Sequence, residues 1–293
     1  MLLCGSADPD AELVIIYGNC QAPHLTIALS QADANLEHRG YLCVLNHAAP
    51  GHEVEMPTPQ QLQRCKFYME QLDTRESVPE REFVRQHIHS IVPKLVFPSY
   101  MMTCFWPFTV PDPRDKTSER FPWGRFPHGN LVAMEVIKKG LTGKVAYETF
   151  MELSTKRMPD LQRALDIDFQ LMEQRDGMSD VRLTDFVRAN FRDHYLFWSH
   201  GHMSAMGVEF LATTLFEATL PFLGDNYEAG LSRLQQGFPN VPPMGNCQYP
   251  IHPAVAQALG LSFYQPDMLF SWHGEMWTFE EYMTRYIAYD TSW

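Results

Sequence analysis

Short apolar segments rich in β-branched residues alternate with helix-forming segments over the first hundred residues of this chain. The pattern predicts strands at residues 13–17, 41–45, 66–69 and 94–97. It predicts helices between them, at residues 23–31, 57–64 and 80–91. Alternation at this spacing is typical of βαβ units, which build a parallel sheet. In such a sheet, ligands bind beyond the carboxyl ends of the strands.

The pattern changes after residue 102, where prolines and aromatic residues follow one another without a helical or strand period. Beyond this irregular stretch the apolar spacing predicts helices at residues 130–140, 142–153, 159–176, 182–192 and 203–220. The predicted fold class is therefore α/β. An N-terminal parallel-sheet subdomain (residues 1–110) is expected to pack on a mainly α-helical C-terminal part (residues 111–293) that completes a cleft.

Composition excludes several classes of protein. The formal net charge of −12 argues against a general nucleic-acid binder, which needs a basic footprint. No stretch approaches about 18 consecutive apolar residues, so no integral membrane segment is expected. The N-terminus lacks the pattern of a signal peptide. The six cysteines include no CxxC pair, which favours reduced thiols and a cytoplasmic protein.

The tetrapeptide Gly18-Asn19-Cys20-Gln21 lies between a predicted strand and a predicted helix. A tight turn at this point would place the Cys20 thiol at a helix N-terminus, where the unpaired N–H groups favour a thiolate. The arrangement is similar to a nucleophile elbow with sulfur in place of the serine oxygen. The same four residue types recur around Cys247, but there prolines stand on both sides. The flanking segments, rather than the tetrapeptide, therefore single out Cys20.

A nucleophilic thiol needs a base, which is usually histidine. The best candidates are His200 and His202, in a Gly-containing turn before a long apolar helix, and His252 is a further one. An oxyanion would need hydrogen-bond donors. The Gln21 N–H comes with the elbow, and the side chain of Asn19 or Gln71 could add another. The HxH pairs lack a convincing third ligand, so no metal site is expected.

The chain resembles the WcbI-type polysaccharide-biosynthesis family, acetyltransferases of bacterial capsule assembly. The resemblance begins at Tyr17-Gly18-Asn19-Cys20-Gln21 and extends over almost the whole length. It continues through Phe97-Pro98-Ser99, residues 130–143, residues 180–186, Leu196-Phe197, residues 250–255, Leu259-Gly260-Leu261 and residues 278–282. Each motif is short, but their order and spacing together are fairly specific.

The resemblance implies an SGNH-hydrolase-like N-terminal part, binding of coenzyme A or acetyl-coenzyme A, and acetyl transfer to a sugar hydroxyl in surface-polysaccharide biosynthesis. Cys20 matches the cysteine of the family motif. His202 falls where the family usually has His-Pro, although Met203 replaces that proline here. The predicted catalytic residues are thus Cys20, His202 and Gln21. The predicted cofactor-binding residues are Gly18, Asn19, Gln71 and His252.

The sequence leaves two other functions open. A thiol-dependent esterase of acylated glycans would let water replace the sugar acceptor. A non-catalytic glycan-binding protein would use tryptophans as sugar platforms, namely Trp106, Trp123, Trp198 and Trp272.

Overall fold

The computed structural model describes residues 1–73, 75 and 78–289. Its contacts form two compact units, and each is built from three segments. The first unit comprises Met1–Met101, Gln170–Ala189 and Gly201–Gly245, and the second comprises Met102–Phe169, Asn190–His200 and Asn246–Trp293. The chain leaves the first unit close to the predicted boundary at residue 110, but two later segments return to it. His202 consequently belongs to the same unit as Cys20.

A five-stranded sheet with the order β1-β3-β2-β4-β5 forms the centre of the first unit. Its strands are β1 (Leu2–Gly5), β2 (Glu12–Gly18), β3 (Arg39–Leu45), β4 (Cys65–Gln71) and β5 (Lys94–Phe97). The pairs β2–β3, β2–β4 and β4–β5 are parallel, which confirms the predicted α/β class. The sequence pattern did not indicate β1, which adds an antiparallel edge strand next to β3.

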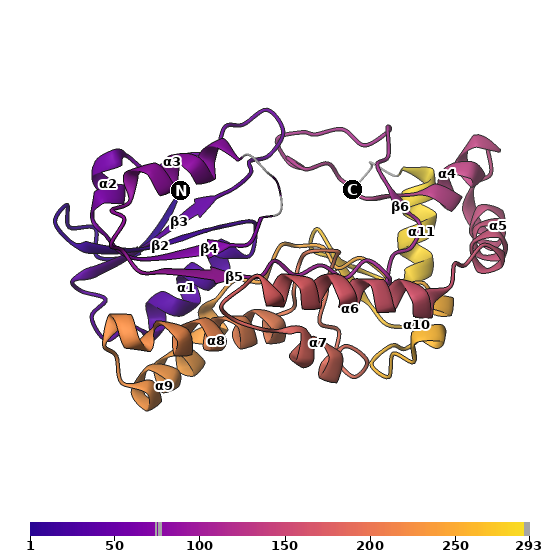
Figure 1. The fold of residues 1–293 in the computed structure, drawn as a ribbon. Coiled ribbons are helices and arrows are strands. Elements are labelled where there is room, and N and C mark those ends of the chain that lie inside the picture. The colour runs from indigo at the N-terminus through magenta and orange to yellow at the C-terminus, as the bar shows by residue number, and fades with distance from the viewer. Residues whose placement is uncertain (74, 76–77, 290–293) are drawn as a thin grey trace. The chain divides into compact units, whose positions relative to one another are not determined.

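One face of this sheet is covered by α2 (Pro59–Gln63) and α3 (Pro79–His87) (Figure 1). Alternate residues of β2, namely Leu13, Ile15 and Tyr17, belong to the buried cluster on this face. They pack there with Leu62 of α2 and Val84 of α3. Helix α3 ends at His87, before its predicted limit of residue 91, because Ile88 adopts an extended backbone conformation.

The opposite face is covered by α1 (Ala22–Ala32), with α8 (Ala205–Leu223) and α9 (Tyr227–Gly237) against it (Figure 1). Helix α9 was not predicted, because two glycines weaken its helical pattern. The structure explains Gly230: a Cβ there would lie 2.1 Å from Cζ of Phe216 in α8. Glycine is thus the residue that lets the two helices approach this closely.

Helix α8 is the one helix among the described residues that is long and apolar enough to cross a membrane. It also packs against α1 and α9, and it buries Leu211, Leu215 and Phe216. These contacts are those of a core helix in the first unit.

The second unit is mainly helical. It contains α4 (Leu131–Lys138), α5 (Gly143–Lys156), α10 (Pro253–Leu259) and α11 (Phe279–Ala288). The unit also contains two small antiparallel sheets. In one, β6 (Thr109–Val110) pairs with β7 (Gly129–Asn130), and in the other, β8 (Phe270–Trp272) pairs with β9 (Glu275–Trp277). Helices α6 (Leu161–Gly177) and α7 (Thr184–Asn190) carry residues of both units. Of the tryptophans considered as sugar platforms, Trp106 and Trp272 are buried in this unit, whereas Trp123 is 51% exposed.

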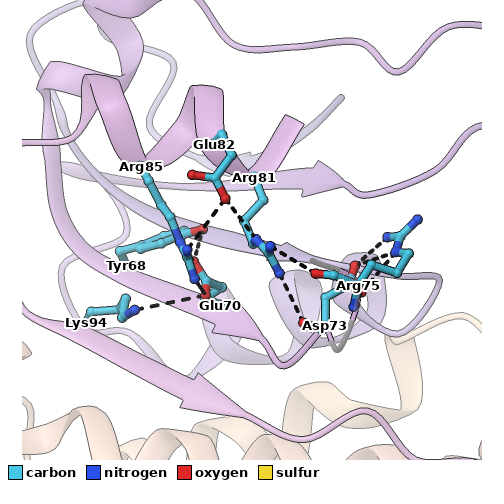
Figure 2. Close-up of polar contacts among 8 residues, drawn as sticks. All are labelled: Tyr68, Glu70, Asp73, Arg75, Arg81, Glu82, Arg85 and Lys94. Atoms are coloured by element: carbon cyan, nitrogen blue, oxygen red, sulfur yellow. Dashed lines mark hydrogen bonds and ion pairs between the residues drawn. The ribbon is translucent and has the colours of Figure 1, made fainter. Parts of the chain in front are cut away.

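A buried carboxylate lies near the carboxyl end of β4 (Figure 2). Glu70 is 3% exposed and accepts hydrogen bonds from Arg85 of α3, at 2.5 Å and 2.8 Å, and from the Tyr68 hydroxyl. Burial by itself would raise the pKa of Glu70. The hydrogen bonds from Arg85 and Tyr68, together with the charge of Lys94, outweigh burial and lower this pKa below its usual value. The ionised Glu70 and Arg85 therefore form an ion pair that holds α3 against the sheet.

We expect Glu70→Gln to lower the free energy of unfolding by about 1–2 kcal/mol at pH 7, because Arg85 loses its charged partner but stays partly exposed to water. A lowered pKa contributes stability above the ordinary carboxyl pKa and loses it as the pH falls through the native pKa. The difference between wild type and variant should therefore be constant above pH ~4.5 and shrink below it.

Urea denaturation between pH 3 and pH 8 measures this difference. Glu12→Gln is the matched control, because Glu12 forms an exposed pair with Lys66 at 3.2 Å in the same sheet. It should change stability by less than about 0.5 kcal/mol. A Glu70→Gln effect that is equally small would contradict a stabilising role of the pair.

Candidate functional site

The chain makes a tight strand–turn–helix connection around Cys20. Strand β2 ends at Gly18, and α1 begins at Ala22. A Cβ at Gly18 would lie 2.9 Å from Oε1 of Gln71 and 3.2 Å from Cβ of Ala22. Glycine at this position therefore lets the β4 side chain and the start of α1 approach the turn. The predicted place of Cys20, just before a helix beyond a strand end, is confirmed.

Gln71, at the end of β4, fastens the turn. Its Oε1 accepts the Asn19 N–H at 2.8 Å, and its Nε2 donates to Oε1 of Gln21 at 2.8 Å. The residue is 2% exposed. Because these bonds occupy both ends of a buried amide, Gln71 acts as a positioning residue for the turn in this structure. It was predicted as a cofactor-binding residue.

Gln21 joins the turn to the loop that carries His202. Its Nε2 donates to the Gly201 carbonyl at 3.0 Å and, more weakly, to the Tyr100 carbonyl at 3.4 Å. Gly201 directly precedes His202, and Gln21 directly follows Cys20. A hydrogen bond from the Gln21 side chain to the Gly201 backbone thus brings the cysteine turn and the histidine loop together.

Asn19 is also held on both sides. Its Oδ1 accepts the Gln21 N–H at 2.9 Å, and its Nδ2 donates to Oγ of Ser99 at 3.3 Å. Ser99 was not among the predicted site residues, although its place just after β5 puts it at the same sheet edge as Cys20. Strand-end position was thus the signal that could have identified it.

Tyr100 is a second residue that was missed. Its hydroxyl donates to Oδ1 of Asp176 at 2.6 Å, and Asp176 also accepts the N–H of Thr184. These bonds connect the end of α6 and the start of α7 to the segment after β5. No sequence pattern indicates this link, because 76 residues separate Tyr100 from Asp176.

The Cys20 thiol is partly exposed, and within the described parts of the chain no imidazole hydrogen-bonds its sulfur. Burial raises the pKa of Cys20 to about 11, and the residue's own backbone N–H opposes this rise. The expectation of a lowered thiol pKa at the helix N-terminus is therefore wrong. Removal of the sulfur from water outweighs the helix-terminus effect.

The turn offers fewer oxyanion donors than predicted. The Gln21 N–H is already donated to Asn19, so in this structure it is not free to bind an oxyanion. By contrast, the Cys20 N–H forms no hydrogen bond with the backbone of the described residues. Cys20 itself is thus the better candidate for a backbone donor at this turn.

The two candidate histidines of the 200–202 turn have different surroundings. His202 is partly exposed in the first unit, where a Cβ at Gly245 would lie 3.5 Å from its Nδ1. His200 belongs to the second unit, where its ring packs at a tilt against Trp106 and edge-on against His128. Burial lowers the pKa of His200 to about 4. Of the two histidines, His202 is therefore the one that shares a unit with Cys20.

His252 is a structural residue in the second unit. Its Nδ1 accepts the Ala254 N–H at 3.1 Å and caps α10, and its Nε2 lies 2.9 Å from Oγ of Ser154. Burial lowers the pKa of His252 to about 4, so the ring is neutral at pH 7. Since both nitrogens are engaged, the structure gives no support to the prediction of His252 as a cofactor ligand.

Cys247 lies in a different environment from Cys20, as the flanking residues predict. No helix begins directly after it, since α10 starts only at Pro253, and its sulfur lies 3.5 Å from Nε2 of His273 at the β8–β9 turn. Burial raises the pKa of Cys247 to about 11. Among the described residues, no group of three or more His, Cys, Asp or Glu side chains is arranged to hold a metal ion.

Comparison with known proteins identifies the relationship of the chain. A family model described as "Polysaccharide biosynthesis enzyme WcbI" matches residues 13–219, which is more than half of the chain. A solved structure of WcbI, described as a novel polysaccharide biosynthesis enzyme, is similar with a TM-score of 0.65 and 16% identity. The match covers 96% of this chain and 91% of that one. That structure is described as the native protein without a disulfide bond between coenzyme A and one of its cysteines. No curated protein matches the chain.

The raised pKa of Cys20 predicts that its thiol reacts slowly with alkylating reagents. At pH 8 about one sulfur in 1,000 would be ionised, so iodoacetamide should label Cys20 roughly 100-fold more slowly than an ordinary thiol. The rate should rise about tenfold per pH unit up to pH ~10. Mass spectrometry of the peptides measures each cysteine separately. The urea-unfolded protein is the control, and labelling of native Cys20 at the unfolded rate would contradict a raised pKa.

Gln71→Leu should lower the free energy of unfolding by about 1–3 kcal/mol, because it leaves the Asn19 N–H and Oε1 of Gln21 without their partner. It should also accelerate labelling of Cys20, since the turn loses its main attachment to β4. Gln236→Leu is the control, because Gln236 makes one exposed side-chain hydrogen bond in α9. Equal effects of both substitutions on Cys20 labelling would show that Gln71 does not position the turn.

Proposed function

This chain belongs to the WcbI family of polysaccharide biosynthesis enzymes, and we propose that it transfers an acyl group from coenzyme A to a hydroxyl group of a carbohydrate. The observation that carries this proposal is the pattern of hydrogen bonds around Cys20. Asn19, Gln21 and Gln71 form hydrogen bonds with one another. The Cys20 thiol, by contrast, is partly exposed and forms no hydrogen bond with a described side chain. The turn thus presents one sulfur at the end of a parallel strand.

The residues present fit a neighbouring thiol or thioester. The Cys20 thiol is neutral at pH 7, and a neutral, partly buried sulfur can lie against the sulfur of a cofactor without charge repulsion. The solved WcbI structure is described as being without a disulfide bond between coenzyme A and one of its cysteines, and we assign the place of that cysteine, next to the cofactor thiol, to Cys20 here. Acetyl-coenzyme A, when bound, supplies the activated acyl group.

We assign the base to His202. The hydrogen bond from Gln21 to the Gly201 carbonyl holds the start of its loop beside the turn that carries Cys20. A neutral imidazole there would take the proton of the acceptor hydroxyl, and general-base catalysis of this kind contributes about 10²–10⁴-fold. The Cys20 N–H would donate to the developing oxyanion.

Direct transfer to the acceptor suits this geometry better than an acyl-cysteine. A covalent route needs a thiolate, and burial disfavours that form of Cys20. In this proposal Cys20 binds and orients the cofactor, and Asn19 and Gln71 hold the turn. The proposal also includes the SGNH-hydrolase-like relationship of the first unit and a cytoplasmic site of reaction.

Cofactor binding is tested by calorimetry of the purified protein with coenzyme A and with desulfo-coenzyme A. Cys20→Ala should weaken binding of coenzyme A more than binding of the desulfo form. Under mild oxidation, intact mass spectrometry should show a coenzyme A adduct on wild type that is absent from Cys20→Ala. Cys247→Ala is the matched control, since Cys247 has the same four-residue motif, and it should retain the adduct.

Catalysis is tested with acetyl-coenzyme A and a panel of sugar acceptors. We expect His202→Ala to lower kcat about 10²–10⁴-fold and Cys20→Ala to lower it less than about tenfold. The control is His38→Ala, which changes an exposed histidine. Loss of activity in His200→Ala but not in His202→Ala would overturn the assignment of the base. Hydrolysis of acyl esters without any coenzyme A binding would instead identify a thiol-dependent esterase.

A further inference from the structure

His24 lies in the first turn of α1, one helical turn after Cys20. The Ala22 N–H donates to the Asn19 carbonyl at 2.9 Å, and Gln21 already has helical backbone angles. The chain thus follows a helical path from the cysteine turn into α1. Residues four apart on such a path lie on one face, with their Cβ atoms about 5–6 Å apart.

The imidazole of His24 is held in one orientation. Side chains on a helix tilt toward its N-terminus, so this ring lies over the turn that carries Cys20. Its Nδ1 lies 2.9 Å from the Pro242 carbonyl oxygen. Because a carbonyl oxygen can only accept, Nδ1 carries a hydrogen and donates it. This bond fixes both the tautomer and the direction of the ring.

The other ring nitrogen of His24 is an unused acceptor. Burial lowers the pKa of His24, and the hydrogen bond to the Pro242 carbonyl opposes this only in part, so the ring is neutral at pH 7. With the hydrogen on Nδ1, Nε2 has a lone pair and can only accept. Nε2 forms no hydrogen bond with any described residue, and the side chain is partly exposed.

The loop of residues 242–245 also lies next to His202. A Cβ at Gly245 would lie 3.5 Å from Nδ1 of His202. The loop is short and constrained, since the Gly245 N–H donates to the Pro243 carbonyl at 2.8 Å. His24, His202 and this loop all belong to the first unit, together with Cys20. The neutral acceptor of His24 is therefore part of the surroundings of the cysteine turn.

The lone pair of Nε2 selects the chemistry of its partner. It fits an N–H or O–H donor, whereas a carboxylate or phosphate would place its own lone pairs against it. In the proposed function the sulfur of coenzyme A lies next to Cys20. The first hydrogen-bond donor along the cofactor from that sulfur is an amide N–H, which a short ethylene spacer separates from the thiol.

We propose that Nε2 of His24 accepts the hydrogen bond of this amide, and that the site thereby selects thiols of the N-acyl-2-aminoethanethiol class over other thiols. The inference deepens the proposed function and rests on the cofactor sulfur lying beside Cys20. It assigns binding and orientation of the cofactor arm to His24, and it leaves the base at His202.

Disulfide exchange at Cys20 tests this with two ligands that differ only in the N–H group. Bis(N-acetyl-2-aminoethyl) disulfide carries the amide, and bis(2-acetoxyethyl) disulfide has an ester oxygen in its place. The Cys20 sulfur bonds to one half of the disulfide, and the other half leaves as a thiol with the Cys20 proton. Mass spectrometry at equilibrium measures both products, so slow reaction of Cys20 does not affect the result.

The urea-unfolded protein gives the intrinsic ratio of the two equilibrium constants. Relative to this ratio, we expect native wild type to favour the amide by about fivefold or more, which corresponds to one hydrogen bond.

Two substitutions separate ligand binding from a structural role of His24. In His24→Asn the side-chain nitrogen takes the place of Nδ1 and keeps the bond to the Pro242 carbonyl, but nothing replaces Nε2. In His24→Gln the terminal amide takes the place of Nε2, but the bond to Pro242 is lost. We expect His24→Asn to lose the amide preference at an unchanged melting temperature. His24→Gln should keep the preference and lower the melting temperature.

His38→Asn is the matched control, because His38 is an exposed histidine in the same unit. It should change neither quantity. Absence of an amide preference in native wild type, or a preference that His24→Asn retains, would overturn the inference. So would loss of the preference in both His24 variants in proportion to their melting temperatures, since that is the result of a structural role alone.

Calorimetry with coenzyme A on the same proteins distinguishes this inference from the proposed function. We expect His24→Asn to weaken coenzyme A binding about fivefold. Coenzyme A binding without an amide preference at Cys20 rejects the role of His24 alone. An amide preference without coenzyme A binding rejects the proposed cofactor and keeps the N-acyl-2-aminoethanethiol site.

Discussion

The amide group of Gln71 is the interaction on which the candidate site depends. It joins the end of β4 to the backbone of Asn19 and to the side chain of Gln21. Gln21 in turn reaches the Gly201 carbonyl, next to His202. Each hydrogen bond contributes little stability by itself. A buried network in which every polar group has a hydrogen-bond partner is nevertheless more rigid than its separate bonds. Cys20 lies in the middle of this network without being one of its members.

Burial gives the thiol of Cys20 a higher pKa than its position at the start of a helix predicts. The start of α1 favours a thiolate, yet desolvation raises the pKa to about 11. The same effect keeps His200 and His252 neutral in the second unit. Neutral groups in dry surroundings suit binding and orientation of uncharged reactants, and they do not suit a thiol that is permanently ionised.

Local patterns predicted the elements that contribute a periodic apolar face. The predicted strands at 13–17, 41–45, 66–69 and 94–97 all lie within observed strands, since β-branched runs are recognisable without tertiary contacts. Helix α9 was missed because Gly230 is explained only by the ring of Phe216 on α8. The return of residues 170–189 and 201–245 to the first unit was missed as well. It depends on links such as Tyr100 with Asp176, which have no local pattern.

The sequence by itself determined the parallel sheet, the turn between β2 and α1, and the place of Cys20 in that turn. Each follows from residues close together in the chain. Tertiary structure alone decided which polar groups are free. It engaged the Gln21 N–H, both ends of Gln71 and both nitrogens of His252. Hydrogen-bond partners and desolvation are set by residues that are distant in sequence, and for that reason chemistry at this site is decided by packing.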